Sequence, residues 1–300
     1  QVYLDEKIGS SPELIQEGIR KAKVAYLLDT KNSKSYENYL NLLYLDSPSE
    51  ALIQWSKLVD GSTEGTSLGN TILRKSLKCL RDQNLELKAK ILIGQNALSQ
   101  FQSLRESVGW DTQAQNLLLG AEILAETGNH KQALGIVEEV LKEDTGNSDA
   151  VFLLTRLAVH QKDKTQLVRL GKLLAPLSSQ RNEVGVEAIR HMTLLNFMQP
   201  LAPQSLERCI QFLSVNPKAQ AVDFLRIYAM LYALKKTELR VSIIKRCAEL
   251  FNLDDSEELL IFANWLVRIQ AYQSIIEYVS PVKAKSNQDF FKIRMAALAK

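Results

Sequence analysis

The sequence predicts an all-α protein built from pairs of short amphipathic helices. Helix-breaking residues are scarce, with 7 Pro and 13 Gly in 300 residues. The abundant residue types, among them Leu, Ala, Lys, Glu and Gln, lose little side-chain freedom on a helix. Apolar residues recur at helical spacing, and a hydrophobic fraction of 46% with 24% charged residues is typical of a folded chain.

The N-terminal third contains five helical patterns. Ser11 is placed as an N-cap, with Pro12 at the first helical position, and Asn84 is a candidate cap further on. The stretch from Gly61 to Thr66 is the most flexible-looking linker and a possible subdivision of the chain. A kink is expected near Gly94. The expected helices span residues 12–28, 35–45, 48–59, 68–80 and 85–104.

The clearest pattern lies between residues 111 and 147. It predicts helices over 112–127 and 130–143, folded back about the turn Thr127-Gly128-Asn129. Ser148 is the expected N-cap of a helix over 149–161. A further helix over 165–174 is expected to end at Pro176, because proline lacks the N–H that a continuing helix needs.

The C-terminal half repeats the pairing. Helices are expected over 182–198 with 204–214, 218–234 with 238–251, 256–270 with 272–279, and 287–300. The most apolar window, residues 221–234, carries Asp223 and Arg226, so it predicts a core-facing helix. No run of 18 apolar residues is present, and this segment is therefore not expected to span a membrane.

The 111–147 unit also has a specific residue pattern. Leu117, Gly120, Ala121 and Leu124 precede Gly128 at the turn, and the residues after it are Ala133, Val137 and Val140. This arrangement resembles the tetratricopeptide repeat, with its pattern W-x2-L-G-x2-Y, then A-x3-F, then P. The resemblance implies a right-handed α-α superhelix, in which hairpins stack because none can bury its apolar face alone. It implies one elongated solenoid over residues 1–300.

The match to that pattern is degenerate. Leu117 stands where the family has Trp, Gly120 where it has Leu, and Thr145 where it has Pro. Looser copies are centred on Ala51-x3-Trp55, on the 148–174 unit and on Ile275-x3-Val279. Related α-solenoids, of the HEAT or half-repeat type, stay open as alternatives. The chain starts with Gln and ends in an unpaired helical pattern, so we expect it to be a segment of a longer protein.

The sequence offers no catalytic or metal-binding motif. His130, His160 and His191 lie in no HExxH or other ligand spacing, and phosphate-loop and nucleophile-elbow patterns are missing. The acidic pairs at 254–255 and 257–258 are explained by capping. The three cysteines are widely spaced and expected to be buried free thiols. We therefore predict no enzymatic activity, no cofactor and no metal.

What remains is a binding surface. In the resembling family, the first helices of successive hairpins line a concave groove that holds a peptide from a partner protein. Carried over to this chain, the candidate partner-binding residues are Glu37, Asn41, Tyr44, Glu122, Glu126, Phe152, Arg156, His160, Asn264 and Arg268. The family arrangement of Lys, Asn and Arg that clamps a C-terminal carboxylate is not matched.

Three functional hypotheses follow. The first is a non-enzymatic scaffold that binds a protein or peptide on the concave face. The second is a spacer or assembly region of a larger, membrane-anchored bacterial protein. The third, nucleic-acid binding, would use the basic residues between 235 and 246 or between 283 and 294. It is disfavoured because aromatic residues are not interleaved with them and the pI is about 8.6. No small-molecule substrate is evident.

Overall fold

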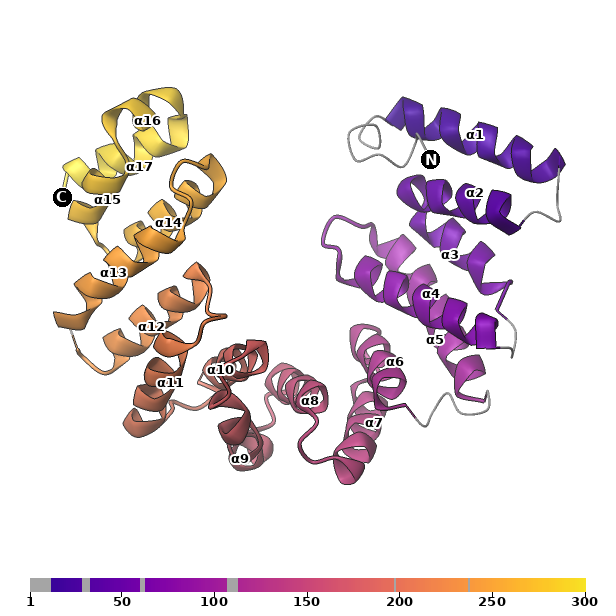
Figure 1. Cartoon of the computed structure of the whole chain (residues 1–300), viewed down its shortest axis with the longest axis horizontal. Coiled ribbons are helices and arrows are strands. Elements are labelled where there is room, and N and C mark those ends of the chain that lie inside the picture. Colours follow the sequence, from indigo (N-terminus) through magenta and orange to yellow (C-terminus); the bar gives the residue numbers. More distant parts are fainter. Residues whose placement is uncertain (1–11, 29–32, 60–62, 107–112, 197, 237) are drawn as a thin grey trace. The chain divides into compact units, whose positions relative to one another are not determined.

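The chain folds into consecutive helices joined by short connections (Figure 1). The computed structural model describes residues 12–28, 33–59, 63–106, 113–196, 198–236 and 238–300. Within these ranges there are 17 α-helices, one short 3-10 helix and no strand. The prediction of an all-α protein is therefore confirmed for the described part of the chain. The expected cap at Ser11 lies outside it.

The helices of the N-terminal half are α1 (Pro12–Leu28), α2 (Ser33–Asp46), α3 (Pro48–Ser56), α4 (Thr63–Arg81), α5 (Leu87–Arg105), α6 (Ala114–Glu126), α7 (His130–Glu143) and α8 (Ser148–Gln161). They are followed by the 3-10 helix η2 (Lys164–Gln166) and by α9 (Leu167–Ser178), α10 (Glu183–Leu195), α11 (Pro203–Val215), α12 (Ala221–Ala233), α13 (Glu238–Leu250), α14 (Ser256–Arg268), α15 (Tyr272–Tyr278), α16 (Pro281–Ser286) and α17 (Gln288–Leu298).

The chain divides into two compact units, Gln1–Leu157 and Ala158–Lys300, with the boundary inside α8. A single solenoid running through both units stays a prediction. So does the subdivision at Gly61 to Thr66. The flexible linker expected there is wrong over residues 63–66, which belong to α4, and residues 61 and 62 lie outside the described part of the chain.

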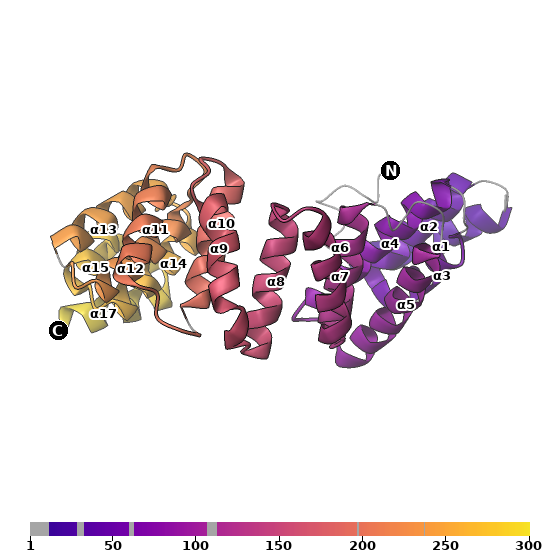
Figure 2. The ribbon, with the colours of Figure 1, turned by 90° about the horizontal axis from the view of Figure 1, so that it is seen from below.

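In the first unit, two pairs of helices pack against each other two places apart along the chain. α4 packs against α5 and also against α6, and α3 packs against α5. Figure 2 shows α6 and α7 side by side. This is the packing expected of stacked hairpins, because each hairpin covers the apolar face of its neighbour. Part of the core is formed by Leu40, Leu52, Trp55, Ile72 and Ile93, all at most 4% exposed.

In the second unit, α9 packs against α10 and α12 against α13. α10 packs more extensively on α9 than on α11, which was its expected partner. The core is rich in aromatic rings, with Phe262 fully buried between Phe251, Trp265 and Tyr278 at centroid distances of 5.4 to 5.8 Å. Burial without a charged neighbour raises the pKa of the Cys209 thiol to about 11. Like Cys79 and Cys247, it is a buried free thiol, as predicted.

Four helices, α6, α8, α12 and α14, end in the same left-handed turn. Each is the first helix of a hairpin predicted from the sequence. Gly128, Lys162, Lys235 and Gln270 have φ values of 84°, 55°, 57° and 57°. In each case the N–H of the following residue donates to the carbonyl five residues earlier in the chain, for example Asn129 to Leu124 at 2.7 Å. This is the Schellman end of a helix, which turns the chain back on itself. Gly128 and Lys162 are 34 residues apart, and Lys235 and Gln270 are 35 apart.

The turn also gives a common register for the four helices. The residues 11, 8, 7 and 4 positions before the left-handed residue are buried in every one of them. They are Leu117, Gly120, Ala121 and Leu124; Val151, Leu154, Thr155 and Ala158; Phe224, Ile227, Tyr228 and Leu231; and Leu259, Phe262, Ala263 and Leu266. A stripe of this spacing occupies one face of a helix. The structural repeat is therefore more regular than the sequence repeat.

Some helix boundaries differ from the prediction. Pro176 was expected to end α9 but lies inside it, two residues before the last residue, Ser178. Proline removes one backbone hydrogen bond of the helix, and the burial of Leu177 and Ser178 offsets that loss. The kink expected near Gly94 is absent, because α5 runs through this residue as one helix. The glycine instead allows a close approach to Thr127, whose Cγ2 would lie 3.0 Å from a Cβ atom at position 94. The short helix α16 was not expected.

Caps were predicted with mixed success. Asn147, not Ser148, caps α8 by accepting the N–H of Ala150 at 3.0 Å. α5 begins after Glu86, so Asn84 is not its cap. Asp255 accepts the N–H groups of Glu257 and Glu258, which confirms capping as the reason for this acidic cluster.

Gly120 marks the closest approach between α5 and α6. A Cβ atom at this position would lie 2.0 Å from Cε2 of Phe101, a ring that is only 4% exposed. The opposite case is Gly135 on α7, which is exposed and has no atom within 4 Å of a Cβ position. An alanine substitution at Gly120 therefore tests the packing of α5 against α6, and one at Gly135 tests the effect of the backbone alone.

We predict opposite effects for the two alanine substitutions. Gly120→Ala should lower the free energy of unfolding by about 1–3 kcal/mol, because the buried Phe101 ring has no space to move. Gly135→Ala should raise it by roughly 0.5–1 kcal/mol through reduced backbone entropy of the unfolded chain. Urea unfolding followed by circular dichroism measures both. Equal effects of the two changes would contradict this packing.

The left-handed turns make a second prediction. Gln270→Gly and Lys162→Gly should each stabilise the protein by about 1 kcal/mol, because a side chain is strained at positive φ and glycine is not. The matched control is Gln273→Gly, an exposed position inside α15, where the same change should cost about 0.5–1 kcal/mol. A loss of stability in Gln270→Gly would show that this turn is not maintained in solution.

Candidate functional site

Two positions on each first helix point away from the core, six and two residues before the left-handed turn residue. On α6 they are Glu122 and Glu126, on α8 Arg156 and His160, and on α14 Asn264 and Arg268. Apart from the half-buried Glu122, all are exposed. Six of the ten residues that the sequence suggested for the concave face thus share one register. Because neighbouring first helices stack in the first unit, such residues can meet there.

In the first unit these residues form ion pairs with one another. Arg81 of α4 donates from Nε to Glu126 Oε1 at 2.8 Å and contacts Glu122 at 3.3 Å. Glu122 is also paired with Arg156 of α8. Burial lowers the pKa of Arg81, but its hydrogen bond to Glu126 and the two glutamate charges raise it above the ordinary value. These pairs are partly exposed, so each stabilises the stack by about 1 kcal/mol or less.

The other candidates have different surroundings. Glu37 is exposed and Asn41 half-buried on α2. Tyr44 packs into the core edge, with its hydroxyl 3.1 Å from Cys79 Sγ and its ring below the ammonium group of Lys75 at 4.4 Å. Burial, followed by the hydrogen bond to Cys79, raises the pKa of Tyr44. Phe152 is half-buried on α8.

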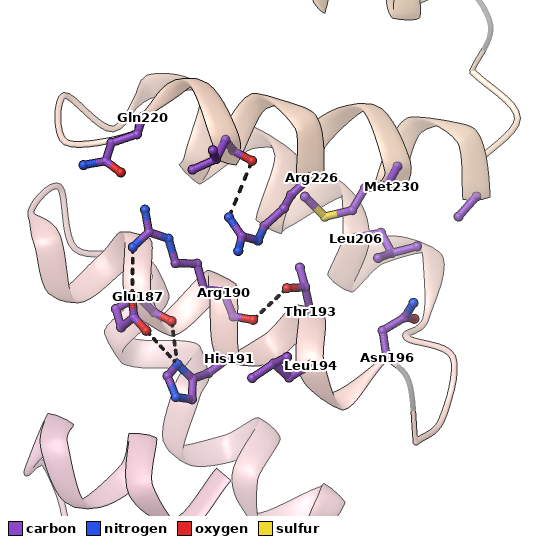
Figure 3. A pocket seen from close by; sticks show the side chains of 13 residues that line it. Glu187, Arg190, His191, Thr193, Leu194, Asn196, Leu206, Gln220, Arg226 and Met230 are labelled. Atoms are coloured by element: carbon purple, nitrogen blue, oxygen red, sulfur yellow. Dashed lines mark hydrogen bonds and ion pairs between the residues drawn. The ribbon is translucent and has the colours of Figure 1, made fainter. Parts of the chain in front are cut away.

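The second unit has a groove between α10 and α12. Its volume is about 700 Å³, and Leu206 of α11 contributes to its lining. Figure 3 shows the wall of α10 with Glu187, Arg190, His191, Thr193, Leu194 and Asn196. The opposite wall consists of the N-cap residue Gln220 and of Val222, Arg226, Ala229, Met230 and Ala233 of α12. Volumes of this size are typical of ligand-binding clefts.

The groove has a polar end and an apolar end. Glu187, Arg190 and Gln220 lie toward one end, and Leu206 and Met230 toward the other (Figure 3). Both apolar side chains are at most 6% exposed. A ligand that fills the groove would therefore contact charged groups and an apolar surface at the same time.

Asp223 organises the polar end although it is completely buried. Its carboxylate accepts two hydrogen bonds from Arg190, both at 2.8 Å, one from Arg226 at 2.9 Å and one from the N–H of Gln220 at 2.9 Å. Burial raises the pKa of Asp223, but these hydrogen bonds and the arginine charges outweigh burial and leave the pKa below its ordinary value. Asp223 therefore stays ionised and ties α10 to α12.

Glu187 extends this network along α10. It accepts a hydrogen bond from Arg190 Nη1 at 3.0 Å, and its Oε1 lies 3.4 Å from His191 Nδ1. The same ring nitrogen is 3.0 Å from the backbone carbonyl of Glu187. The acid–base groups of the groove are thus engaged with each other.

The groove exists because α12 has small side chains at its two outward positions. Ala229 and Ala233 stand six and two residues before the turn residue Lys235, where α6 and α8 carry long polar side chains. The candidates predicted from the sequence are mostly polar residues, and none of them lies on α12. The sequence does contain a signal for this groove. Two alanines stand at the outward positions of the apolar window that also carries Asp223 and Arg226.

Comparisons with known proteins do not extend this description. No protein-family model matches the chain, and a search of curated proteins finds no significant match. Within the described residues, none of the helices has the length and apolar character needed to cross a membrane. In the same part of the chain, no three His, Cys, Asp or Glu side chains are grouped so that they could hold a metal ion.

Asp223 can be tested through the pH dependence of stability. Asp223→Asn should lower the free energy of unfolding at pH 7 by about 3 kcal/mol, because it removes the buried carboxylate charge that accepts three hydrogen bonds from Arg190 and Arg226. The pKa of Asp223 is lower in the folded than in the unfolded state. Its contribution is therefore complete above the unfolded value of about 3.9 and is lost as the pH falls through the folded pKa.

Urea unfolding of the wild type and of Asp223→Asn at pH 7, 4 and 2.5 measures this difference. Asp289→Asn, at an exposed ion pair with Lys292, is the control and should change stability by less than about 0.5 kcal/mol. A difference between wild type and Asp223→Asn that is independent of pH would contradict an ionised Asp223.

Proposed function

We propose that this chain is a non-enzymatic helical-repeat scaffold that binds a segment of a partner protein in the groove between α10 and α12. The observation that carries the proposal is the groove itself, which lies between the outward faces of two helices and has a volume of about 700 Å³. Its Ala229 and Ala233 occupy the same register as the polar residues of the other first helices.

The resemblance to tetratricopeptide repeats supports the choice of α12 as one wall of the groove, whereas α10 packs mainly on α9 and does not end in a left-handed turn. In that family the first helices of the hairpins line the surface that holds a partner peptide. In this chain the left-handed turns at Gly128, Lys162, Lys235 and Gln270 support the assignment of the first helices. Membership of the family is part of the proposal.

The character of the groove also favours a protein segment. Peptide-binding grooves combine apolar pockets for side chains with polar groups that fix the orientation of the bound chain. Leu206 and Met230 supply the first feature, and Arg190 and Arg226 supply the second. Glu187 accepts a hydrogen bond from Arg190 and lies beside His191 Nδ1, an arrangement that favours a structural role over proton transfer.

Selection of peptides on the protein tests this proposal. Phage-displayed random 12-residue peptides are panned on the purified chain and on an Ala229→Trp variant. The wild type should enrich a consistent set of peptides, and Ala229→Trp should lose their binding at least about tenfold because the indole fills the groove. Ala229 is exposed, so the substitution should leave the fold intact.

The control variant is Ala296→Trp, which adds the same indole to an exposed position of α17. It should bind the enriched peptides like the wild type. If no peptide is enriched, or if Ala229→Trp binds as well as the wild type, the groove is not the binding site and the proposal fails.

A further inference from the structure

Arg190 and Arg226 use their donors differently. Arg190 donates from Nε and Nη2 to Asp223 and from Nη1 to Glu187, so all three of its nitrogens are engaged. Arg226 makes its contacts through Nη1 alone, to Asp223 at 2.9 Å and, weakly, to the carbonyl of Val222 at 3.5 Å. No described residue accepts a hydrogen bond from its Nε or Nη2.

The remaining edge of Arg226 faces the groove. Figure 3 shows the guanidinium group of Arg226 pointing from α12 toward α10, between Arg190 and Thr193. Its orientation is fixed by Asp223, which is itself held by Arg190 and by the N–H of Gln220. The two parallel N–H donors, Nε–H and Nη2–H, are thus held in place before a ligand binds. Binding would therefore cost the protein little conformational entropy.

The chemistry of this edge selects a carboxylate. Nε–H and Nη2–H of a guanidinium group match the two oxygens of a carboxylate in a bidentate pair. A phosphate dianion would fit the donors but would carry its second charge beside the carboxylates of Glu187 and Asp223. Arg190, Arg226, Glu187 and Asp223 have a formal sum of zero, so recognition depends on this short-range pairing and not on long-range attraction.

An apolar site lies one helical turn away. Met230 follows Arg226 by four residues and therefore shares its face of α12. It lies beside Leu206 of α11, and Leu194 lies across the groove (Figure 3). A ligand held by Arg226 would thus place its neighbouring group against three aliphatic side chains.

We propose that the groove recognises an acidic–aliphatic motif in a partner protein. An Asp or Glu side chain pairs with Nε and Nη2 of Arg226, and a Leu, Ile or Met side chain of the same segment packs against Leu206 and Met230. This inference rests on the proposed function and adds the chemistry of the partner. It is separate from the capture of a C-terminal carboxylate, because the bound group is a side chain within the segment.

The panned peptides supply the probe. The most enriched 12-residue sequence is synthesised with an acetylated N-terminus, an amidated C-terminus and a fluorescent label, and its binding is measured by fluorescence polarisation. It should contain an acidic residue with an aliphatic residue nearby. Replacing that acidic residue by its amide should weaken binding by about 10- to 100-fold, the range for a charge-assisted bidentate pair.

Protein variants connect this loss to Arg226. Arg226→Gln should weaken binding of the acidic peptide by a similar factor and should no longer distinguish it from the amide peptide, which completes a double-mutant cycle. Arg226→Lys keeps the charge but loses the planar edge, so it should restore only a minor part of the affinity. Arg208→Gln, an exposed arginine on α11, is the matched control and should bind like the wild type.

The outcomes separate the two proposals. Enriched peptides that are blocked by Ala229→Trp but lack an acidic residue, or that tolerate Arg226→Gln, would overturn the inference and leave the proposed function intact. The same holds if binding requires a free C-terminal carboxylate or is tighter for a phosphoserine in place of the acid. Thermal melting of each variant verifies its fold. An Arg226→Gln variant that melts within about 3 °C of the wild type and has lost the peptide supports the inference.

Discussion

The left-handed residue at the end of a first helix is the constraint on which much of this fold depends. With one residue at positive φ and two hydrogen bonds back to the helix, the chain reverses within a few residues. The reversal sets the face of the helix that meets its neighbours. The residues 11, 8, 7 and 4 positions earlier are buried in all four helices that end this way, although they range from Gly120 and Ala121 to Phe262 and Tyr228.

The same register decides what the outward face can do. Where its positions carry long charged side chains, as on α6 and α8, neighbouring helices exchange ion pairs such as Glu122 with Arg156. At Ala229 and Ala233 the side chains of α12 are single methyl groups, which leave space between α12 and α10, and a groove results. The size of the side chains six and two residues before the turn thus decides the character of the surface. Long charged side chains form ion pairs between neighbouring helices, and alanines leave a groove that can accept another chain.

The helices could largely be predicted from the sequence, because prolines and apolar stripes mark them directly; α1 was predicted with its observed bounds. The left-handed conformation of the turns could be recognised from the sequence only at Gly128. Lys162, Lys235 and Gln270 adopt the same conformation at a cost in strain that tertiary packing outweighs, and nothing in those residue types indicates it. The groove was missed for a related reason. Its decisive residues are alanines, and its charged residues come together only when α10 packs beside α12.

The position of Asp223 explains why a charge is kept in the most apolar stretch of the chain. Burying a carboxylate costs free energy that its ion pairs roughly offset, and an apolar pair of similar volume at positions 190 and 223 could join α10 and α12 about as well. Such a pair would, however, remove the acceptor that holds Nη1 of Arg226 at 2.9 Å. The guanidinium group would then be free to rotate, and its remaining donors would no longer point across the groove. The buried acid therefore orients Arg226 in addition to tying α10 to α12.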